Sequence, residues 1–136
     1  MIDLTLAMAE TAVRAAQAKA RELGSPMTVT VVDEAGRLVL SARGDGTGFL
    51  TPETSRAKAA AAAAFRKSTT ELGEMAAKGH GFWAVVPTVT SEKVLPTPGG
   101  AVILKGGRAI GGIGCGGGTG EQDQECADAG AAAVKA

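Results

Sequence analysis

A single histidine, His80, is the one side chain in this sequence whose charge changes near neutral pH without help from its surroundings. It stands in the segment KGHGFW, where Trp83 follows three residues later. An imidazole in this place could act as a general acid or base, and the indole ring could lie against a flat ligand. The alternative is that His80 is a histidine in a surface loop and has no functional role. We therefore carry His80 and Trp83 forward as candidate site residues.

Lys58 interrupts an alanine-rich segment, RAKAAAAAA, that spans residues 56–64. Packing of small apolar side chains does not account for a lysine in such a stretch. Its ammonium group could bind the carboxylate of a ligand or substrate, or an acid across a subunit interface. Alternatively, it could face solvent on an exposed helix surface. Lys58 is therefore a candidate both for catalysis and for ligand binding.

Residues 111–120 contain seven glycines and lead into the last predicted helix. Backbone amides at a helix N-terminus suit a carboxylate or phosphate, which makes Gly116, Gly117 and Gly118 candidate ligand-binding residues. The segment lacks the Lys-Ser/Thr ending of a phosphate-binding P-loop. The competing interpretation, which we favour slightly, is close packing between subunits or against the first helix.

The two cysteines and one aspartate complete the candidates. Cys115 ends a predicted strand beside the glycines, where a stabilised thiolate could act as a nucleophile. Cys126 has the spacing of a small, buried helix residue. Asp33 begins a turn and is expected to bind the amides of that turn. Two cysteines provide neither a disulfide framework nor a zinc ligand set.

These residues need helices and strands to position them, and hydrophobic periodicity predicts both. Helices are predicted over residues 5–23, 51–65, a short segment after 68 that ends near 79, and 121–135. Strands are predicted over 27–33, 37–42, 101–105 and 109–114, with a further strand near 82–86 in an otherwise irregular stretch from 80 to 100. Short hairpin connections require antiparallel pairing. The expected fold is α+β, an antiparallel sheet of about five strands flanked by helices in the order α-β-β-α-α-β-β-α.

Local signals predict where several helices begin and end. Thr5 and Ser68 are expected N-caps, and Glu71 completes a capping box with Ser68. Thr51, which precedes a proline, is expected to cap the alanine-rich helix in the same way. Gly24 is expected to end the first helix.

Composition limits the classes of function. The 136 residues suit one domain spanning 1–136, and 14 basic residues balance 14 acidic ones. This balance, without a basic stripe, argues against nucleic-acid and membrane partners. Acidic residues near the start and the lack of a long apolar run favour a cytoplasmic protein. A core so rich in alanine favours a homo-oligomer, with the second or last helix buried between subunits.

Five stretches together resemble the GlcG/HbpS family, which includes the C-terminal domain of PduO-type adenosyltransferases. They cover nearly the whole chain in the family's order. They are the opening helix, TVTVVDEAGRLVLSARGDG (28–46), RAKAAAAAAFRKST (56–69), PTPGGAVILKGGRAIGGIGCGG (96–117) and QDQECADAGAAAV (122–134).

The resemblance implies a profilin-like sheet, assembly into dimers or larger oligomers, and binding of haem or another tetrapyrrole. Haem-ligating members are expected to use a histidine, which the PduO-type domain carries on its first helix. The first helix here has none. Any haem binding is therefore expected to depend on His80 as the iron ligand, and no other metal site is predicted.

Three hypotheses follow for the function. The first is a small-ligand-binding protein of the GlcG/HbpS type, with haem or another tetrapyrrole as ligand. The second is a metal-free enzyme acting on a small hydroxy or oxo acid, with His80 transferring the proton. The third is an accessory oligomer without chemistry.

Overall fold

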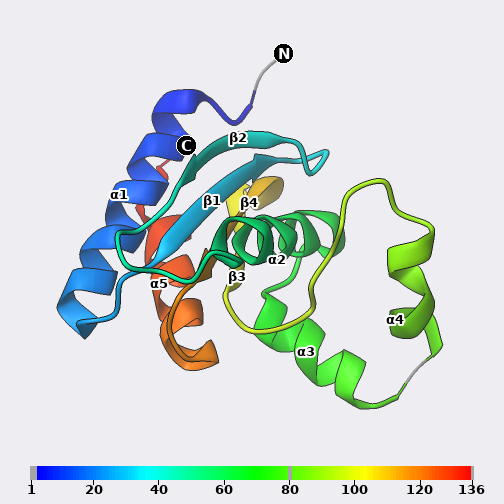
Figure 1. Cartoon of the computed structure of the whole chain (residues 1–136). Coiled ribbons are helices and arrows are strands. Elements are labelled where there is room, and N and C mark those ends of the chain that lie inside the picture. Colours follow the sequence, from blue (N-terminus) through cyan, green and yellow to red (C-terminus); the bar gives the residue numbers. More distant parts are fainter. Residues whose placement is uncertain (1–2, 80, 136) are drawn as a thin grey trace.

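The computed structural model describes residues 3–79 and 81–135 as five α-helices, one short 3-10 helix and four strands (Figure 1). His80 lies outside the described residues. The helices are α1 (Leu6–Leu23), α2 (Thr51–Phe65), α3 (Thr69–Ala77), α4 (Gly81–Val85), η1 (Val86–Thr88) and α5 (Gly120–Ala133). The strands are β1 (Thr28–Asp33), β2 (Leu38–Ala42), β3 (Gly100–Lys105) and β4 (Arg108–Gly116).

The four strands form one antiparallel sheet in the order β2-β1-β4-β3. Two hairpins, β1–β2 and β3–β4, meet through β1 and β4. The turn of the second hairpin is Gly106-Gly107, and both residues have positive φ, which glycine adopts without a steric penalty. The predicted α+β class and antiparallel pairing are confirmed.

Helices cover both faces of the sheet, α1 and α5 on one side and α2 on the other (Figure 1). On the α1/α5 side, β-branched residues of the sheet pack against small residues of the helices. This main core includes Val29, Val31 and Ile113 from the strands with Ala12 and Ala16 from α1. The helices can approach each other closely because alanines and Gly130 occupy their contact.

The α2 side is built differently, because β4 presents glycines to this helix. A side-chain carbon at Gly112 would overlap the carbonyl oxygen of Ala59, and one at Gly114 would overlap that of Ser55. The backbone of α2 therefore rests directly on the backbone of β4. The five alanines from Ala59 to Ala63 are all buried within a single chain, with Ala59 and Ala63 at this contact. The argument that these alanines are too many to be buried within one chain is therefore wrong for Ala59 to Ala63.

Hydroxyl groups fill the seam between β1 and α2. The Oγ1 atoms of Thr28 and Thr51 lie 2.8 Å apart, and Thr30 Oγ1 lies 2.7 Å from Ser55 Oγ. Thr51 therefore does not cap α2, contrary to the sequence prediction. Its hydroxyl donates to the carbonyl of Gly48 and bonds to a threonine 23 residues away in sequence. The N-cap position is Leu50, which makes no side-chain cap.

The N-caps predicted at Thr5 and Ser68 are confirmed, but the capping box is only half formed, because the described residues show no hydrogen bond from the Ser68 amide to the Glu71 side chain. The hydroxyl of Thr5 accepts from Met8 N, and that of Ser68 accepts from Glu71 N. Gly24 ends α1 in the left-handed conformation. Asp33 also behaves as expected, since its Oδ1 accepts from the amides of Ala35 and Arg37 in the β1–β2 turn.

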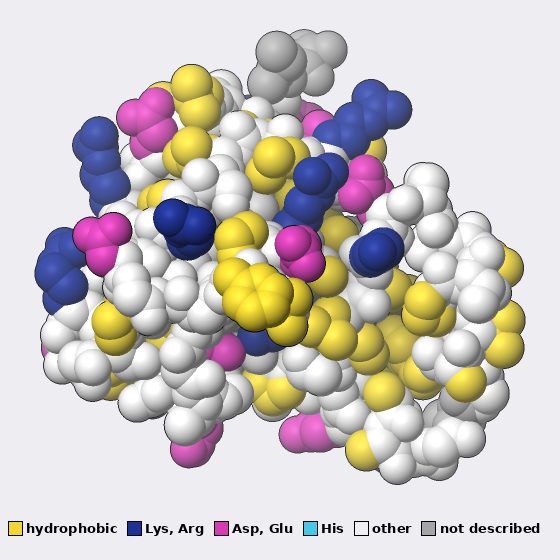
Figure 2. All heavy atoms as spheres, in the orientation of Figure 1, with side chains coloured by type: hydrophobic (Ala, Val, Ile, Leu, Met, Phe, Trp, Pro, Cys, Tyr) yellow, Lys and Arg dark blue, Asp and Glu magenta, His cyan; other side chains and the backbone are white. Residues whose placement is uncertain are grey.

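The expected strand near 82–86 is wrong, because Gly81–Val85 forms the short helix α4. The sheet of the described residues consequently has four strands rather than about five. None of the residues of α4 is buried. The helix extends from the body of the domain, and Figure 2 shows hydrophobic side chains in the hollow between the two.

Candidate functional site

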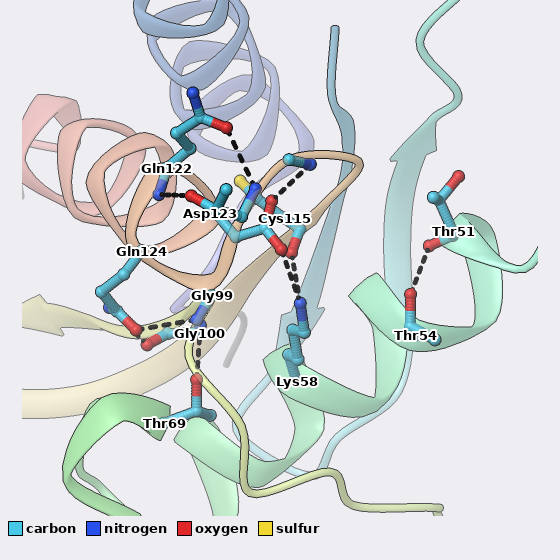
Figure 3. Close-up of polar contacts among 12 residues, drawn as sticks. Thr51, Thr54, Lys58, Thr69, Gly99, Gly100, Cys115, Gln122, Asp123 and Gln124 are labelled. Carbon is cyan, nitrogen blue, oxygen red and sulfur yellow. Dashed lines mark hydrogen bonds and ion pairs between the residues drawn. The ribbon is translucent and has the colours of Figure 1, made fainter. Parts of the chain in front are cut away.

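The sequence-predicted residue Lys58 is almost completely buried, with 6% of its surface exposed. Its Nζ lies 3.0 Å from Asp123 Oδ2 and donates to the carbonyl oxygen of Cys115 at 3.0 Å (Figure 3). The side chain reaches these partners by passing Gly99, where a side-chain carbon would come within 2.9 Å of Nζ. The interpretation of Lys58 as a solvated surface lysine is therefore wrong.

Asp123 is the centre of this buried cluster. Its second oxygen, Oδ1, accepts from the amide of Gly118 at 2.9 Å. Burial raises the pKa of the Asp123 carboxyl, and this effect outweighs the hydrogen bonds from Gly118 and Lys58, which lower it. The carboxylate thus ties the middle of α2 to the loop that precedes α5. The sequence reasoning missed Asp123, although an acid in the first turn of a helix is a recognisable signal.

The candidate ligand-binding glycines, Gly116, Gly117 and Gly118, lie between this cluster and the α1–β1 connection. Gly117 has a φ of +137°, and a side-chain carbon there would lie 2.5 Å from the carbonyl oxygen of Pro26. One at Gly118 would lie 2.7 Å from Met27 Cε. These contacts give the glycines a packing role, but against α2 and the α1–β1 connection rather than against the first helix.

The N-terminus of α5 is capped by the protein itself. Thr119 Oγ1 accepts from Gln122 N, and Gln122 Oε1 accepts from Thr119 N, which together form a capping box. Gly118 N already donates to Asp123. Several of the amides that the sequence suggested for an anion therefore have partners within the chain.

Both thiols are buried and unpaired. Burial raises the pKa of Cys115 well above its ordinary value, and that of Cys126 to about 11. Both groups are therefore protonated at neutral pH, which removes the basis for a nucleophilic Cys115. Cys126 is the small buried residue that its spacing predicted.

Trp83 belongs to an aromatic cluster at the other end of α2. Its ring centroid lies 5.0 Å from that of Phe65, the last residue of the helix, and 5.2 Å from that of Phe82. Lys58 lies two helical turns earlier and points to Asp123. The structure therefore gives the two candidates different partners and does not bring them together in one polar site.

A cavity that the sequence reasoning missed lies between the end of α1 and the loop after β2. Its volume is about 540 Å³. Ala20, Pro26 and Met27 give it apolar walls, while Arg21 and Arg43 provide two guanidinium groups. Its lining also includes Gln17, Gly24, Ser25, Gly44 and Asp45. Arg43 and Asp45 belong to the segment SARGDG, whose charged residues were the available signal.

The two arginines of this cavity are exposed. Among the ion pairs of the described residues, none involves Arg21 or Arg43. The cavity is therefore suited to an anionic ligand with an apolar body. The Lys58–Asp123 cluster supports its wall indirectly, since Asp123 holds Gly118 and the Gly118 backbone packs behind Ser25 and Met27.

A second cavity of about 340 Å³ lies beside α2 and the β1–β2 turn. Its lining carries the two acids Glu34 and Glu92 among small and apolar residues. Glu92 pairs with Arg56 at 3.5 Å, and Glu34 pairs with Arg108 at 3.6 Å. The described lining of this cavity contains two acids and no arginine, whereas that of the first contains two arginines and one acid, Asp45.

Residues 3–79 and 81–135 lack the features of two further classes of protein, metal-binding and membrane-spanning. They contain no group of three or more histidine, cysteine, aspartate or glutamate side chains arranged to hold a metal ion. None of the helices in these segments has the length and apolar character needed to cross a membrane.

The sequence matches the model of a known protein family over almost the full length of the chain. The family described as "Haem degrading protein HbpS-like" matches residues 4–132, and the chain belongs to this family. The resemblance drawn from the five sequence stretches is thereby confirmed.

Relatives with solved structures have the same fold. A crystal structure described as the PduOC:heme complex has 28% identity and a TM-score of 0.87, with 98% of this chain and 96% of that chain covered. A double mutant of HbpS from Streptomyces reticuli has 31% identity and a TM-score of 0.87, with coverage of 100% and 90%.

A relative at the sequence level is the corrinoid adenosyltransferase PduO of Salmonella typhimurium. It is 31% identical over 121 residues, which are 89% of this chain but only 36% of that protein. The chain thus spans about a third of the length of this relative.

Proposed function

We propose that this chain binds a haem-type tetrapyrrole in the cavity lined by Arg21 and Arg43. One observation carries the proposal: Arg21 and Arg43 line the same cavity as apolar residues. Membership of the HbpS-like family and the likeness to a haem-complexed relative support the ligand class.

The residues present fit the chemistry of such a ligand. A haem-type tetrapyrrole combines a flat apolar ring with carboxylates at one edge. Arg21 and Arg43 can bind carboxylates, and guanidinium groups do so with two parallel hydrogen bonds where the geometry permits. Pro26 is exposed and offers apolar surface to the ring, while the apolar lining residues Ala20 and Met27 are almost fully buried. The volume of about 540 Å³ lies within the range of small-molecule sites.

The second cavity fits this ligand less well. Its described lining contains no lysine or arginine to bind the carboxylates of a tetrapyrrole, and its volume is smaller. We therefore assign the ligand to the cavity at the end of α1.

Titration with haemin tests the proposal. We expect the Soret band to shift on binding, with a saturable fit. The double variant Arg21→Met/Arg43→Met should weaken binding about tenfold or more, because each lost charge-assisted contact contributes roughly 1.5 kcal/mol or more before solvent screening.

The matched control is Arg14→Met/Arg37→Met, which removes two positive charges outside the cavity lining. It should bind haemin as the unmodified chain does. If both double variants weakened haemin binding equally, the effect of the arginines would come from the net charge of the protein and not from contacts in the cavity. Failure of the unmodified chain to bind haemin would refute the proposal.

We also propose that the chain forms a homo-oligomer. Its support is a set of exposed large apolar side chains, among them Phe49 at 84% and Val89 at 75% exposure. Others are Leu50, Phe82 and Val85. Light scattering during size exclusion should give the mass of at least a dimer, and Phe49→Ser should shift it toward the monomer if that residue lies in the interface. A monomer at micromolar concentration would contradict it.

A cytoplasmic location is proposed from the chemistry of the two thiols. Cys115 and Cys126 are both unpaired and buried, as is usual for proteins of a reducing compartment. Fractionation of the native host, followed by immunodetection, would test it, and recovery outside the cytoplasm would refute it.

A further inference from the structure

The cavity at the end of α1 offers more to the carboxylates of a tetrapyrrole than to its metal. This inference rests on the function proposed above and deepens it. The two groups best suited to binding, Arg21 and Arg43, are cations that line the cavity without an ion-pair partner among the described residues. A cation attracts a carboxylate and does not coordinate iron.

The possible iron ligands of the lining are poorly placed for that task. Haem iron is held by histidine, cysteine thiolate, methionine or tyrosine. Among the described lining residues only Met27 belongs to this group. It is 2% exposed, and its Cε packs where a side-chain carbon at Gly118 would lie 2.7 Å away. Met27 is therefore a buried residue of the main core.

The remaining ligand types are restricted across the chain. The sequence contains no tyrosine and one histidine, His80. Both cysteines are buried, and their thiols are protonated because burial raises the pKa of each. A thiolate ligand in the cavity would require the core around Cys115 or Cys126 to open.

We propose that this site recognises the ring and carboxylates of a tetrapyrrole and binds the metal-free and metal-containing forms alike. The ligand class is a porphyrin carrying carboxylates, with the contacts made by Arg21 and Arg43. This differs from the expectation that His80 ligates haem iron, and the two make opposite predictions.

The test compares three probes on the full chain: metal-free protoporphyrin IX, zinc protoporphyrin IX and haemin. Fluorescence gives the dissociation constants of the first two, and absorbance gives that of haemin. We expect the three affinities to agree within about threefold, since iron ligation would otherwise add to the haemin affinity alone. Bound haemin should show a high-spin spectrum. Arg21→Met/Arg43→Met should weaken all three by about the same factor.

Two results would overturn the inference while leaving the proposed function intact. One is haemin affinity more than about thirtyfold above that of the metal-free porphyrin, with a low-spin spectrum. The other is a selective loss of haemin affinity in His80→Ala with metal-free binding retained, which would assign iron ligation to His80. Failure of all three probes to bind would instead refute the proposed function itself.

Discussion

Lys58 and Asp123 lie 65 residues apart in sequence, yet their side chains form a 3.0 Å ion pair in the interior of the domain. The pair joins the middle of α2 to the first turn of α5. Hydrogen bonds to Cys115 and Gly118 extend it to the last residues of β4 and to the loop between β4 and α5. A buried pair of this kind makes the structure sensitive to the loss of either partner.

Lys58→Met should destabilise the protein by about 3–5 kcal/mol, because the Asp123 carboxylate would remain buried without its cation. Urea unfolding at pH 7 measures the change. Lys67→Met is the control, since Lys67 forms an exposed pair with Glu71 and should cost less than about 1 kcal/mol. Similar small changes for both variants would show that the buried pair contributes little.

The stability of Lys58→Met should also depend on pH. Lys58 lowers the pKa of Asp123, so its removal should raise that pKa further above its ordinary value. A carboxyl whose pKa is higher in the folded than in the unfolded state favours folding when protonated. The stability difference from the unmodified protein should therefore shrink as the pH falls from 7 toward the ordinary pKa of an aspartate. A difference that stays constant between pH 7 and 4.5 would contradict this account.

Gly114→Ala should destabilise the fold severely or prevent folding, because the added carbon would overlap the carbonyl oxygen of Ser55 on α2. Relief requires the whole helix to move. Gly48→Ala is the matched control, since a side-chain carbon there meets no atom within 4 Å. Thermal melting of the two variants gives the comparison. A melting temperature for Gly114→Ala close to that of the control would show that α2 can shift without cost.

Both thiols should resist alkylation in the native protein. Burial raises the pKa of each, to about 11 for Cys126, so the reactive thiolate is scarce at pH 8. Iodoacetamide at pH 8 should leave the folded chain unmodified by mass spectrometry and add two labels in denaturant. Rapid single labelling of the folded chain would reveal an accessible cysteine and reopen the nucleophile hypothesis for Cys115.

Local chemistry predicted much of the fold. The caps at Thr5 and Ser68 depend on residues three positions away, so the sequence contains both partners in one window. Thr51 has the same chemistry, but its hydroxyl partner Thr28 lies on strand β1, 23 residues away in sequence. The segment 82–86 is a short apolar run, for which periodicity does not distinguish strand from helix.

The candidate site was harder to predict, because its parts come together only in the folded chain. Arg21 lies in the last turn of α1, and Arg43 follows the end of β2. Neither position alone distinguishes an arginine of a cavity from an ordinary surface arginine. For Lys58, the sequence indicated an unusual residue but not its partner. To predict Asp123 as that partner, one would have to know that α2 lies across the end of β4.

The direct contact between α2 and β4 also constrains how this protein can change over evolutionary time. On the α1/α5 side, residues such as Val29, Val31 and Ile113 can exchange volume with their neighbours. On the α2 side, Gly112 and Gly114 have no side chain to shrink, and the helix leaves no room for them to grow. Related sequences should therefore vary in side-chain volume at the former positions and retain glycine at Gly112 and Gly114.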